Sequence, residues 1–495
     1  MHAGPNGKQG EIMKKLWCLR GLPRLSGVAA SFLVMSLAVP VASASTALYV
    51  DQASSSCSNS GPGSQAVPFC SIQSAANVVD PGQTVYIETA PGSQNYDENV
   101  TITRSGTPSA PITFARLGTE LLPDVDPYTN GGVPITLRNV HDVRLYFLAV
   151  DHRNGQNGIE VTGSSDITLD RVRDAYDSAN TLTSAGVTVD GASSDVTISR
   201  AEISGGDGYG VQVQPGALRV TVTTSEIVME NGTGIALNDA ASGAVTSNTM
   251  WVPDCGAGVG ITGGSSAVAE NNIIDMWGKV ACAPPAAALS VDQDSAGTVR
   301  ADYNAVFVRG SSTRYSWAGT SYADAAAFNA ATGQGAHDLG LTSAIQGNVP
   351  PAGSPVIDSA DCTAPGELST DFQANPRVRD PLVTDTGVGT CYADRGAFEL
   401  QDSLNPAPSA ITPTSLQGPV PFNLTVTLNA PAKSGWGEPV SYTIDFGDGS
   451  GPVLVASAST TSHTYTTAGQ YTLTMTAADT GGSTVTYQRQ VVAET

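Results

Sequence analysis

A short phrase that returns at a nearly constant spacing dominates the middle of the sequence. A glycine, an apolar residue, any residue and a second apolar residue recur in steps of 28, 24, 24 and 24 residues, beginning at Gly158, Gly186, Gly210, Gly234 and Gly258. Apolar residues at alternate positions are typical of a short β-strand with one buried face. A period of this size indicates stacked repeats, in which no unit can bury its own apolar face.

Each unit holds two or three short strands, which leaves no room for a crossover helix. The chain must therefore coil, so that each strand pairs in parallel with its copy one turn later, about 4.8 Å along the axis. We predict an all-β fold, a parallel β-helix. Its inward residues are Ile159, Val161, Val187, Val189, Val211, Val213, Ile235, Leu237, Val259 and Ile261. The outward residues of the phrase are Glu160, Thr188, Gln212, Ala236 and Gly260, which fade to small neutral side chains. The glycine phrase thus specifies a scaffold.

The first 44 residues are typical of a secretory signal peptide. Basic residues precede an apolar run at 28–41, and small residues follow it, with a cleavage point after Ala44. About 14 apolar residues are too few to span a bilayer comfortably, and no later stretch is apolar enough. We therefore predict a secreted protein without a transmembrane segment. Met13 is an alternative start, which leaves the status of residues 1–12 open.

The charge balance excludes some partners. The 495-residue chain has a formal net charge of −22, and residues 1–44 carry five basic residues and one acidic one, so the remainder carries −26. Such a chain should not bind nucleic acid or anionic lipid through its overall field. A solubilising charge on a secreted protein, expected to be a monomer, explains the acidity equally well.

Six cysteines remain after the predicted signal, in three pairs of near neighbours. Sequential pairing would staple one loop of the coil per pair, and no pair has the spacing of a zinc site. We therefore predict disulfides formed in an oxidising compartment, namely Cys57–Cys70, Cys255–Cys282 and Cys362–Cys391.

Composition divides the rest of the chain. Residues 45–400 form the predicted β-helix domain, with an atypical first coil as N-terminal cap and an irregular closing region. Residues 401–412 are rich in Pro and Ser and suit a linker. Residues 413–495 show longer alternating strands with turns every 8–12 residues, which predicts a small β-sandwich.

Three segments resemble known families. The stretch at 48–114 and the repeats after it resemble the secreted right-handed β-helix proteins of the pectate-lyase-like superfamily. The segment from SPVIDS to DRGAFEL resembles the closing module of choice-of-anchor Q bacterial surface proteins. Residues 407–495 resemble a PKD domain, through YTIDFGDGS at Tyr442 and HTYTTAGQYTLTMTAAD at His463. Because the chain ends without an apolar tail, release from a bacterial cell is expected rather than anchoring.

The superfamily includes polysaccharide lyases and hydrolases, and a column of charged side chains bears on that chemistry. The period places Arg173, Glu202 and Glu226 in one column, with the two glutamates about 5 Å apart. A salt-bridged surface ladder is one interpretation. A Ca²⁺ site that adds oxygen ligands from Asp207 and Glu230 is a second, and a catalytic carboxylate pair is a third.

The neighbouring column is predicted to hold Arg171, Arg200, Thr224, Asn248 and Asn272. Stacked asparagines at a turn would satisfy backbone groups along the axis. Asp151, His152 and Arg153 place an acid, a base and a cation in one predicted inter-coil loop, which suits either proton chemistry or a solvated loop.

These observations leave three hypotheses about function. The first is a secreted protein that binds polysaccharide or cell-surface glycans along a β-helix groove, with the PKD domain as an accessory contact. The second is a β-helix polysaccharide lyase or glycoside hydrolase. The third is a structural surface or matrix protein. The motifs of polygalacturonase-type hydrolases are absent from the sequence, which weakens the second hypothesis.

Overall fold

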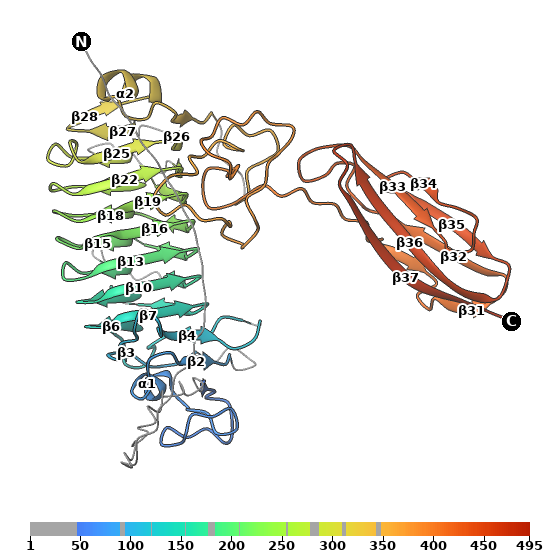
Figure 1. Ribbon diagram of the computed structural model, residues 1–495, viewed down its shortest axis with the longest axis horizontal. Coiled ribbons are helices and arrows are strands. Elements are labelled where there is room, and N and C mark those ends of the chain that lie inside the picture. Colours follow the sequence, from blue (N-terminus) through green and yellow to red (C-terminus); the bar gives the residue numbers. More distant parts are fainter. Residues whose placement is uncertain are drawn as a thin grey trace, which may run out of the picture. The chain divides into compact units, whose positions relative to one another are not determined.

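The predicted parallel β-helix is confirmed in the computed structural model, where strands stack along one axis and form three long sheets (Figure 1). The structure describes residues 47–89, 95–119, 121–153, 155–176, 184–206, 208–253, 256–277, 287–308, 313–342 and 348–495. The predicted signal peptide lies outside these residues. Each full coil of the chain contributes one strand to each sheet in turn, in the order sheet A, sheet B and sheet C.

Sheet A consists of ten strands: β1 (Leu48–Val50), β2 (Thr84–Ile87), β4 (Ile112–Arg116), β7 (His141–Tyr146), β10 (Ser165–Asp170), β13 (Ser194–Ser199), β16 (Val220–Thr223), β19 (Ser242–Thr246), β22 (Ser266–Glu270) and β25 (Val299–Asp302). Sheet B consists of nine: β5 (Asp124–Val125), β8 (Ala149–His152), β11 (Arg173–Tyr176), β14 (Glu202–Gly205), β17 (Glu226–Met229), β20 (Thr249–Pro253), β23 (Ile273–Trp277), β26 (Ala305–Val308) and β29 (Leu339–Gly340).

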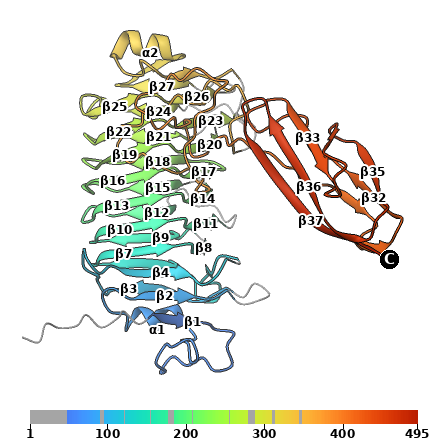
Figure 2. The same cartoon turned by 45° about the vertical axis from the view of Figure 1, so that its right-hand side comes forward.

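Sheet C consists of ten strands: β3 (Val100–Ile102), β6 (Ile135–Arg138), β9 (Ile159–Thr162), β12 (Ala185–Val189), β15 (Tyr209–Val213), β18 (Thr233–Leu237), β21 (Val259–Ile261), β24 (Ala287–Val291), β27 (Thr313–Trp317) and β28 (Thr320–Tyr322). Figure 2 shows the strands of sheet C between those of sheets A and B. A helix lies near each end of the coil, α1 (Ile72–Ala76) and α2 (Ala325–Thr332).

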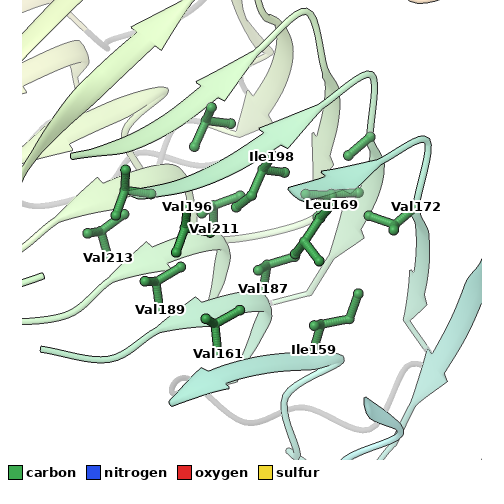
Figure 3. Close-up of a cluster of buried hydrophobic side chains, with 14 of the residues drawn as sticks. Ile159, Val161, Leu169, Val172, Val187, Val189, Val196, Ile198, Val211 and Val213 are labelled. Carbon is green, nitrogen blue, oxygen red and sulfur yellow. The ribbon is translucent and has the colours of Figure 1, made fainter. Parts of the chain in front are cut away.

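Alternating apolar residues fill the interior of the coil as predicted. Ile159, Val187 and Val211 align on successive strands of sheet C, and all ten predicted inward residues are at most 1 % exposed. Figure 3 shows these side chains meeting the inward residues of sheet A, such as Ile198. Burying one such side chain contributes about 1.5–3 kcal/mol, so stacking of rungs stabilises what no single rung could.

The repeated glycine is required by close packing between rungs. A Cβ atom at Gly210 would lie 2.6 Å from the carbonyl oxygen of Gly234 and 2.7 Å from Cγ2 of Ile227, which points inward from sheet B. Both distances are shorter than carbon atoms tolerate, and the first neighbour is rigid backbone. Gly260, at an outward position of the same sheet, has nothing closer than 3.5 Å. The glycines therefore let sheet B side chains fill the interior.

One coil is shorter than its neighbours, and this corrects the predicted second column. Glu226 pairs with Thr249, a step of 23 residues, so Ser247 rather than Asn248 takes the place equivalent to Thr224. Thr224 and Ser247 both have left-handed backbone, with φ of 52° and 55°. The placement of Asn248 and Asn272 in the column of Thr224 is therefore wrong by one residue.

The predicted role of the stacked asparagines is confirmed. Oδ1 of Asn248 accepts from the backbone N–H of Ser225 at 3.0 Å, and Oδ1 of Asn272 accepts from the backbone N–H of Asn248 at 3.1 Å. Asn304 extends the ladder by accepting from the N–H of Asn272 at 3.2 Å. These amides, at most 2 % exposed, satisfy backbone donors where the chain turns from sheet A to sheet B.

Residues 351–400, all of which the structure describes, pack on the outer face of sheet A as an irregular closing module. The hydroxyls of Thr223 and Thr246 donate to the carbonyls of Gly366 (2.8 Å) and Pro365 (2.7 Å). Asn271 and the backbone of Asp361 exchange two hydrogen bonds. The predicted disulfide Cys362–Cys391 closes this module, and Cys57–Cys70 closes the N-terminal loop. The pair Cys255–Cys282 lies outside the described residues.

The C-terminal part is a β-sandwich with its own core. One sheet contains β30 (Ala410–Thr412), β32 (Phe422–Thr427) and β35 (Thr460–Tyr465). The other contains β31 (Gln417–Pro419), β37 (Thr484–Glu494), β36 (Gly469–Asp479), β33 (Val440–Asp445) and β34 (Val453–Val455). Leu424, Ile444 and Tyr465 are fully buried between them.

Candidate functional site

The outer face of sheet A carries a column of hydroxyl side chains that ends in arginine on either side. Register aligns Arg144 with Thr168, Thr197 and Thr221 on successive strands, and the column continues through Ala244 and Val268 to Arg300. These positions point away from the core because side chains alternate along a strand. They form a polar floor that repeats once per rung.

Two walls turn this floor into a groove. On one side, Asp142, Asp166, Asp195 and Arg219 occupy successive turns before the strands, each with left-handed backbone near φ 56°. On the other side, Pro365 of the closing module covers part of the same face. Two cavities of about 520 and 480 Å³ lie along the floor and share Arg219 and Thr221, so the groove is continuous over several rungs.

Opposite charges balance within the groove. Arg219 donates from Nε and Nη2 to the two carboxylate oxygens of Asp195, both at 2.6 Å, and this lowers the pKa of Asp195. Arg300 donates to Oε2 of Glu270 at 2.8 Å. Three arginines and three aspartates line the two cavities together. Paired guanidinium and carboxylate groups of this kind can hydrogen-bond to sugar hydroxyls without imposing a net charge.

Aromatic rings extend the outer face of sheet A toward the N-terminus. Tyr49 and Tyr86 pair in register, with ring centroids 5.7 Å apart, and Tyr146 lies two strands further along the same column. All three are partly exposed. Aromatic rings on a polar strand surface provide apolar faces on which sugar rings can stack.

A second polar cluster lies on the outer face of sheet B. Asp124 is in register with Ala149, and Ala149 with Arg173, while Asp151 follows two residues after Ala149. Burial raises the pKa of Asp124 to about 7, and the charge of Asp151 adds to the rise while Arg173 opposes it. Burial also raises the pKa of Asp151. Among the described residues, Oδ1 of each aspartate and Nε of Arg173 are buried without a hydrogen-bond partner.

The predicted column of Arg173, Glu202 and Glu226 is confirmed by strand register. Burial raises the pKa of Glu226 to about 7, with a further rise from the charge of Glu202, while Nδ2 of Asn348 donates to it at 3.0 Å. Glu202 and Arg173 also line a small cavity of about 170 Å³ together with Arg171 and Arg200. The column therefore combines the guanidinium of Arg173 with a carboxyl group, that of Glu226, able to titrate near neutral pH.

The segment Asp151–Arg153 is not a loop triad, which corrects the prediction. Strand β8 continues to His152, so alternation turns that side chain into the core while Asp151 faces outward. Nδ1 of His152 lies 2.8 Å from Oδ1 of the fully buried Asp174. Arg153 binds both oxygens of Asp126 at 3.1 and 2.9 Å. The base is thus separated from the acid and the cation.

The Ca²⁺ hypothesis at Glu202 and Glu226 stays a prediction. Asp207 lies outside the described residues, and Glu230 is exposed after the end of β17. Among the residues with described positions, no three His, Cys, Asp or Glu side chains gather closely enough to hold a metal ion. Any cation there would need ligands beyond the two glutamates.

The sequence analysis did not single out the groove on sheet A. Its signal is nonetheless present, because the second strand of three units reads DITL, DVTI and RVTV, with threonine always at the outward third position. The wall at Pro365 had no such signal, since it lies more than 100 residues from the strands that it covers.

Comparisons with known proteins agree with this architecture. Residues 128–283 match the family model described as right handed beta helix region, and residues 409–492 match the PKD domain model. The chain is a right-handed β-helix followed by a PKD domain. Neither model covers residues 351–400, so the likeness to a choice-of-anchor Q module stays a prediction. No curated protein matches the sequence.

Several solved structures share the fold at low sequence identity. Pectate lyase Pel9A is 15 % identical, with a TM-score of 0.44 over 72 % of this chain and 96 % of that one. A rhamnogalacturonan lyase is 13 % identical, with a TM-score of 0.35 over 55 % and 84 %. An alginate lyase from Paenibacillus sp. is 15 % identical, with a TM-score of 0.34 over 50 % and 94 %. Such similarity describes the fold alone.

Two further observations concern location. The two disulfides of the described residues and the PKD domain fit an extracellular protein. In the part of the chain that the structure describes, no helix is long and apolar enough to cross a membrane.

Proposed function

We propose that this protein is secreted from a bacterial cell and binds a neutral or weakly charged polysaccharide along the groove of sheet A. The continuous groove over successive rungs carries the proposal, because its polar floor repeats about every 4.8 Å, comparable to one sugar residue in an extended glycan. The PKD domain is then an accessory contact or spacer.

The chemistry of the lining supports a neutral ligand. Arg219 is neutralised by Asp195, and Arg300 by Glu270, so neither guanidinium presents a free charge to an anionic chain. The floor carries threonine hydroxyls at Thr168, Thr197 and Thr221, which both donate and accept hydrogen bonds, and continues with the apolar Ala244 and Val268. The rings of Tyr49 and Tyr86 provide a stacking surface at one end.

Affinity electrophoresis against neutral and uronate polysaccharides tests this proposal. Thr197→Trp would place a bulky ring on the floor and should weaken binding at least about tenfold, a loss of about 1.4 kcal/mol. Ser204→Trp is the matched control, because Ser204 lies on the same coil but on the outer face of sheet B. Retardation that both variants reduce equally, or that neither reduces, would contradict binding on sheet A. No retardation by any glycan would favour a structural protein.

A second candidate function is glycan cleavage on sheet B. The specific observation is that Asp124 and Glu226 have pKa values near 7, a range suited to general acid or base catalysis. Arg173 lies between them in register and could neutralise a uronate carboxylate. A lyase would need this neutralisation. A hydrolase would instead use Glu202 and Glu226, which pair in register on adjacent strands, as the two carboxyl groups across the scissile bond.

Product analysis distinguishes the two functions. The protein is incubated with uronate and neutral polysaccharides, with and without Ca²⁺, and unsaturated and reducing ends are measured. An enzyme on sheet B would be established by two results together. Glu226→Gln should lower the cleavage rate about 100-fold or more, and Thr197→Trp should cleave a short substrate at the wild-type rate. Binding without any new chain ends would support the first proposal.

A further inference from the structure

The closing module contains two buried aspartates whose carboxyl groups are incompletely satisfied. Asp358 is 0 % exposed and Asp380 is 1 % exposed. Oδ2 of Asp358 accepts from the backbone N–H of Asp380 at 3.0 Å, and Oδ1 of Asp380 accepts from the backbone N–H of Leu382 at 2.8 Å. The second oxygen of each carboxyl, Oδ1 of Asp358 and Oδ2 of Asp380, has no hydrogen-bond partner.

Other buried carboxyls of the same module show how unusual this is. Both oxygens of Asp371 accept backbone N–H groups, from Asn375 at 2.7 Å and from Glu399 at 3.2 Å. Both oxygens of Asp394 do so as well. Burying an acceptor without a partner costs about 1–3 kcal/mol, and more when it is charged. The two bare oxygens therefore lack the compensation that the carboxyls of Asp371 and Asp394 receive among the described residues.

The surroundings concentrate negative charge on these two atoms. The hydrogen bond from the backbone of Asp380 turns the Asp358 carboxyl toward the Asp380 residue. Burial raises the pKa of Asp358 to about 6, and the charges of Asp380 and Asp385 contribute to the rise while Arg379 opposes it. The guanidinium of Arg379 lies over the ring of Tyr392, 5.6 Å from its centroid. At pH 7.5 the Asp358 carboxyl is therefore mostly ionised.

The local backbone is built to hold this arrangement. Asp358 has a left-handed backbone with φ of 47°, and its carbonyl accepts from the N–H groups of Thr386 and Gly387 at 3.0 and 3.2 Å. Oδ1 of Asp385 accepts from Gly387 at 3.0 Å, which folds the exposed Asp385 over the same turn.

We propose that Asp358 and Asp380 bind one divalent cation inside the closing module, with Ca²⁺ as the ion best matched to the site. Ca²⁺ takes six to eight oxygen ligands in flexible geometry, so backbone carbonyls and water can complete a site with two carboxylates. Sites of extracellular modules have dissociation constants of about 10⁻⁴–10⁻³ M. The site is separate from the groove and from the residues of sheet B.

Calorimetry of the full chain after chelator treatment tests the proposal. Saturating Ca²⁺ at pH 7.5 should raise the unfolding temperature of the β-helix transition by about 3 °C or more. Asp358→Asn and Asp380→Asn should abolish this rise, and each should lower the Ca²⁺ bound at equilibrium dialysis by one ion. Asparagine also tolerates left-handed backbone, so Asp358→Asn keeps the local conformation. Asparagine keeps one acceptor oxygen, so each variant can retain the single hydrogen bond that its carboxyl accepts.

Asp361→Asn is the matched control. Asp361 belongs to the same module, and its Oδ1 accepts from the backbone and hydroxyl of Thr363 at 2.8 and 2.7 Å, contacts that asparagine can keep. This variant should retain the full response to Ca²⁺. An unfolding temperature that does not respond to Ca²⁺, or that responds equally in all variants, would overturn the proposal. If acidification stabilises the metal-free protein and Ca²⁺ has no effect, Asp358 and Asp380 share a proton instead, and the proposal is wrong.

Discussion

The buried ladder of Asn248, Asn272 and Asn304 offers the sharpest test of what holds the coils together. Asn272 is its central member, and replacing it with alanine removes both the acceptor and the donor. Oδ1 of Asn272 accepts from the backbone N–H and from Nδ2 of Asn248, at 3.1 and 3.0 Å. Nδ2 of Asn272 donates to the carbonyl of Val245 at 2.8 Å and to Oδ1 of Asn304 at 3.0 Å.

The magnitude follows from what each partner retains after the change. The backbone N–H of Asn248 is stranded in the core, which costs about 1–3 kcal/mol. Nδ2 of Asn248 keeps the carbonyl of Val222, and Oδ1 of Asn304 keeps the N–H of Asn272. Each of these loses one bond of two, worth about 1 kcal/mol each. Asn272→Ala should therefore destabilise the β-helix by about 3–5 kcal/mol.

Urea unfolding followed by circular dichroism measures this difference. Asn238→Ala is the control, because Asn238 lies in a half-exposed turn of the same helix and accepts one long bond of 3.4 Å from Thr262. That variant should change stability by less than about 0.5 kcal/mol. If the free energies of unfolding of Asn272→Ala and of the control differ by less than about 1 kcal/mol, the ladder does not stabilise the β-helix as its hydrogen bonds suggest.

Two further perturbations test the interior. Gly210→Ala should lower the free energy of unfolding by about 2–3 kcal/mol in the same urea assay, because its Cβ would overlap backbone atoms. Gly260→Ala should have nearly wild-type stability, and equal losses in the two variants would contradict the packing argument. Burial lowers the pKa of His152, but Asp174 outweighs this effect and leaves the pKa raised, so wild-type stability should fall as pH rises above about 6.5. In Asp174→Asn the effects of burial and of the charge of Asp151 remain, and burial is the larger, so stability should instead rise between pH 5 and 7, by about 1.4 kcal/mol for each unit of pKa change. Urea midpoints measured across this pH range show whether stability rises or falls with pH in each protein. The same dependence on pH in the wild type and in Asp174→Asn would refute the role of Asp174.

The fold could be predicted because local pattern and global structure agree in a stacked repeat. Ile159, Val187 and Val211 are inward both by alternation and by register, since these rungs pair over 28 and 24 residues, the same steps that separate the glycines. The extrapolation failed at Asn248, because the turn between β18 and β19 is one residue shorter and shifts the later strands of sheets A and B by one residue, while sheet C keeps its step of 24. The constant spacing of the glycine phrase gives no sign of such a shorter turn, which only the strand register shows.

The candidate site could be predicted less well, for reasons that differ between the two faces. Arg173, Glu202 and Glu226 were accessible because one strand column contains them. The groove was not, because the closing module contacts the ends of β16 and β19 through hydrogen bonds between residues more than 100 positions apart. The role of His152 was also hidden, since the end of β8 decides whether its side chain points inward or outward.

The charge of the whole chain and the charge of the groove both favour a neutral glycan as ligand. A chain of net charge −22 repels polyanions at long range. A groove could reverse this locally with unpaired arginines, but Arg219 and Arg300 are each held by a carboxylate, and Arg144 shares its cavity with Asp142 and Asp166. Because guanidinium groups that already bind carboxylates offer little gain to a uronate, a neutral glycan loses least on entering the groove. Selective binding of a polyuronate at physiological salt would therefore move the site away from sheet A, toward the three arginines beside Glu202.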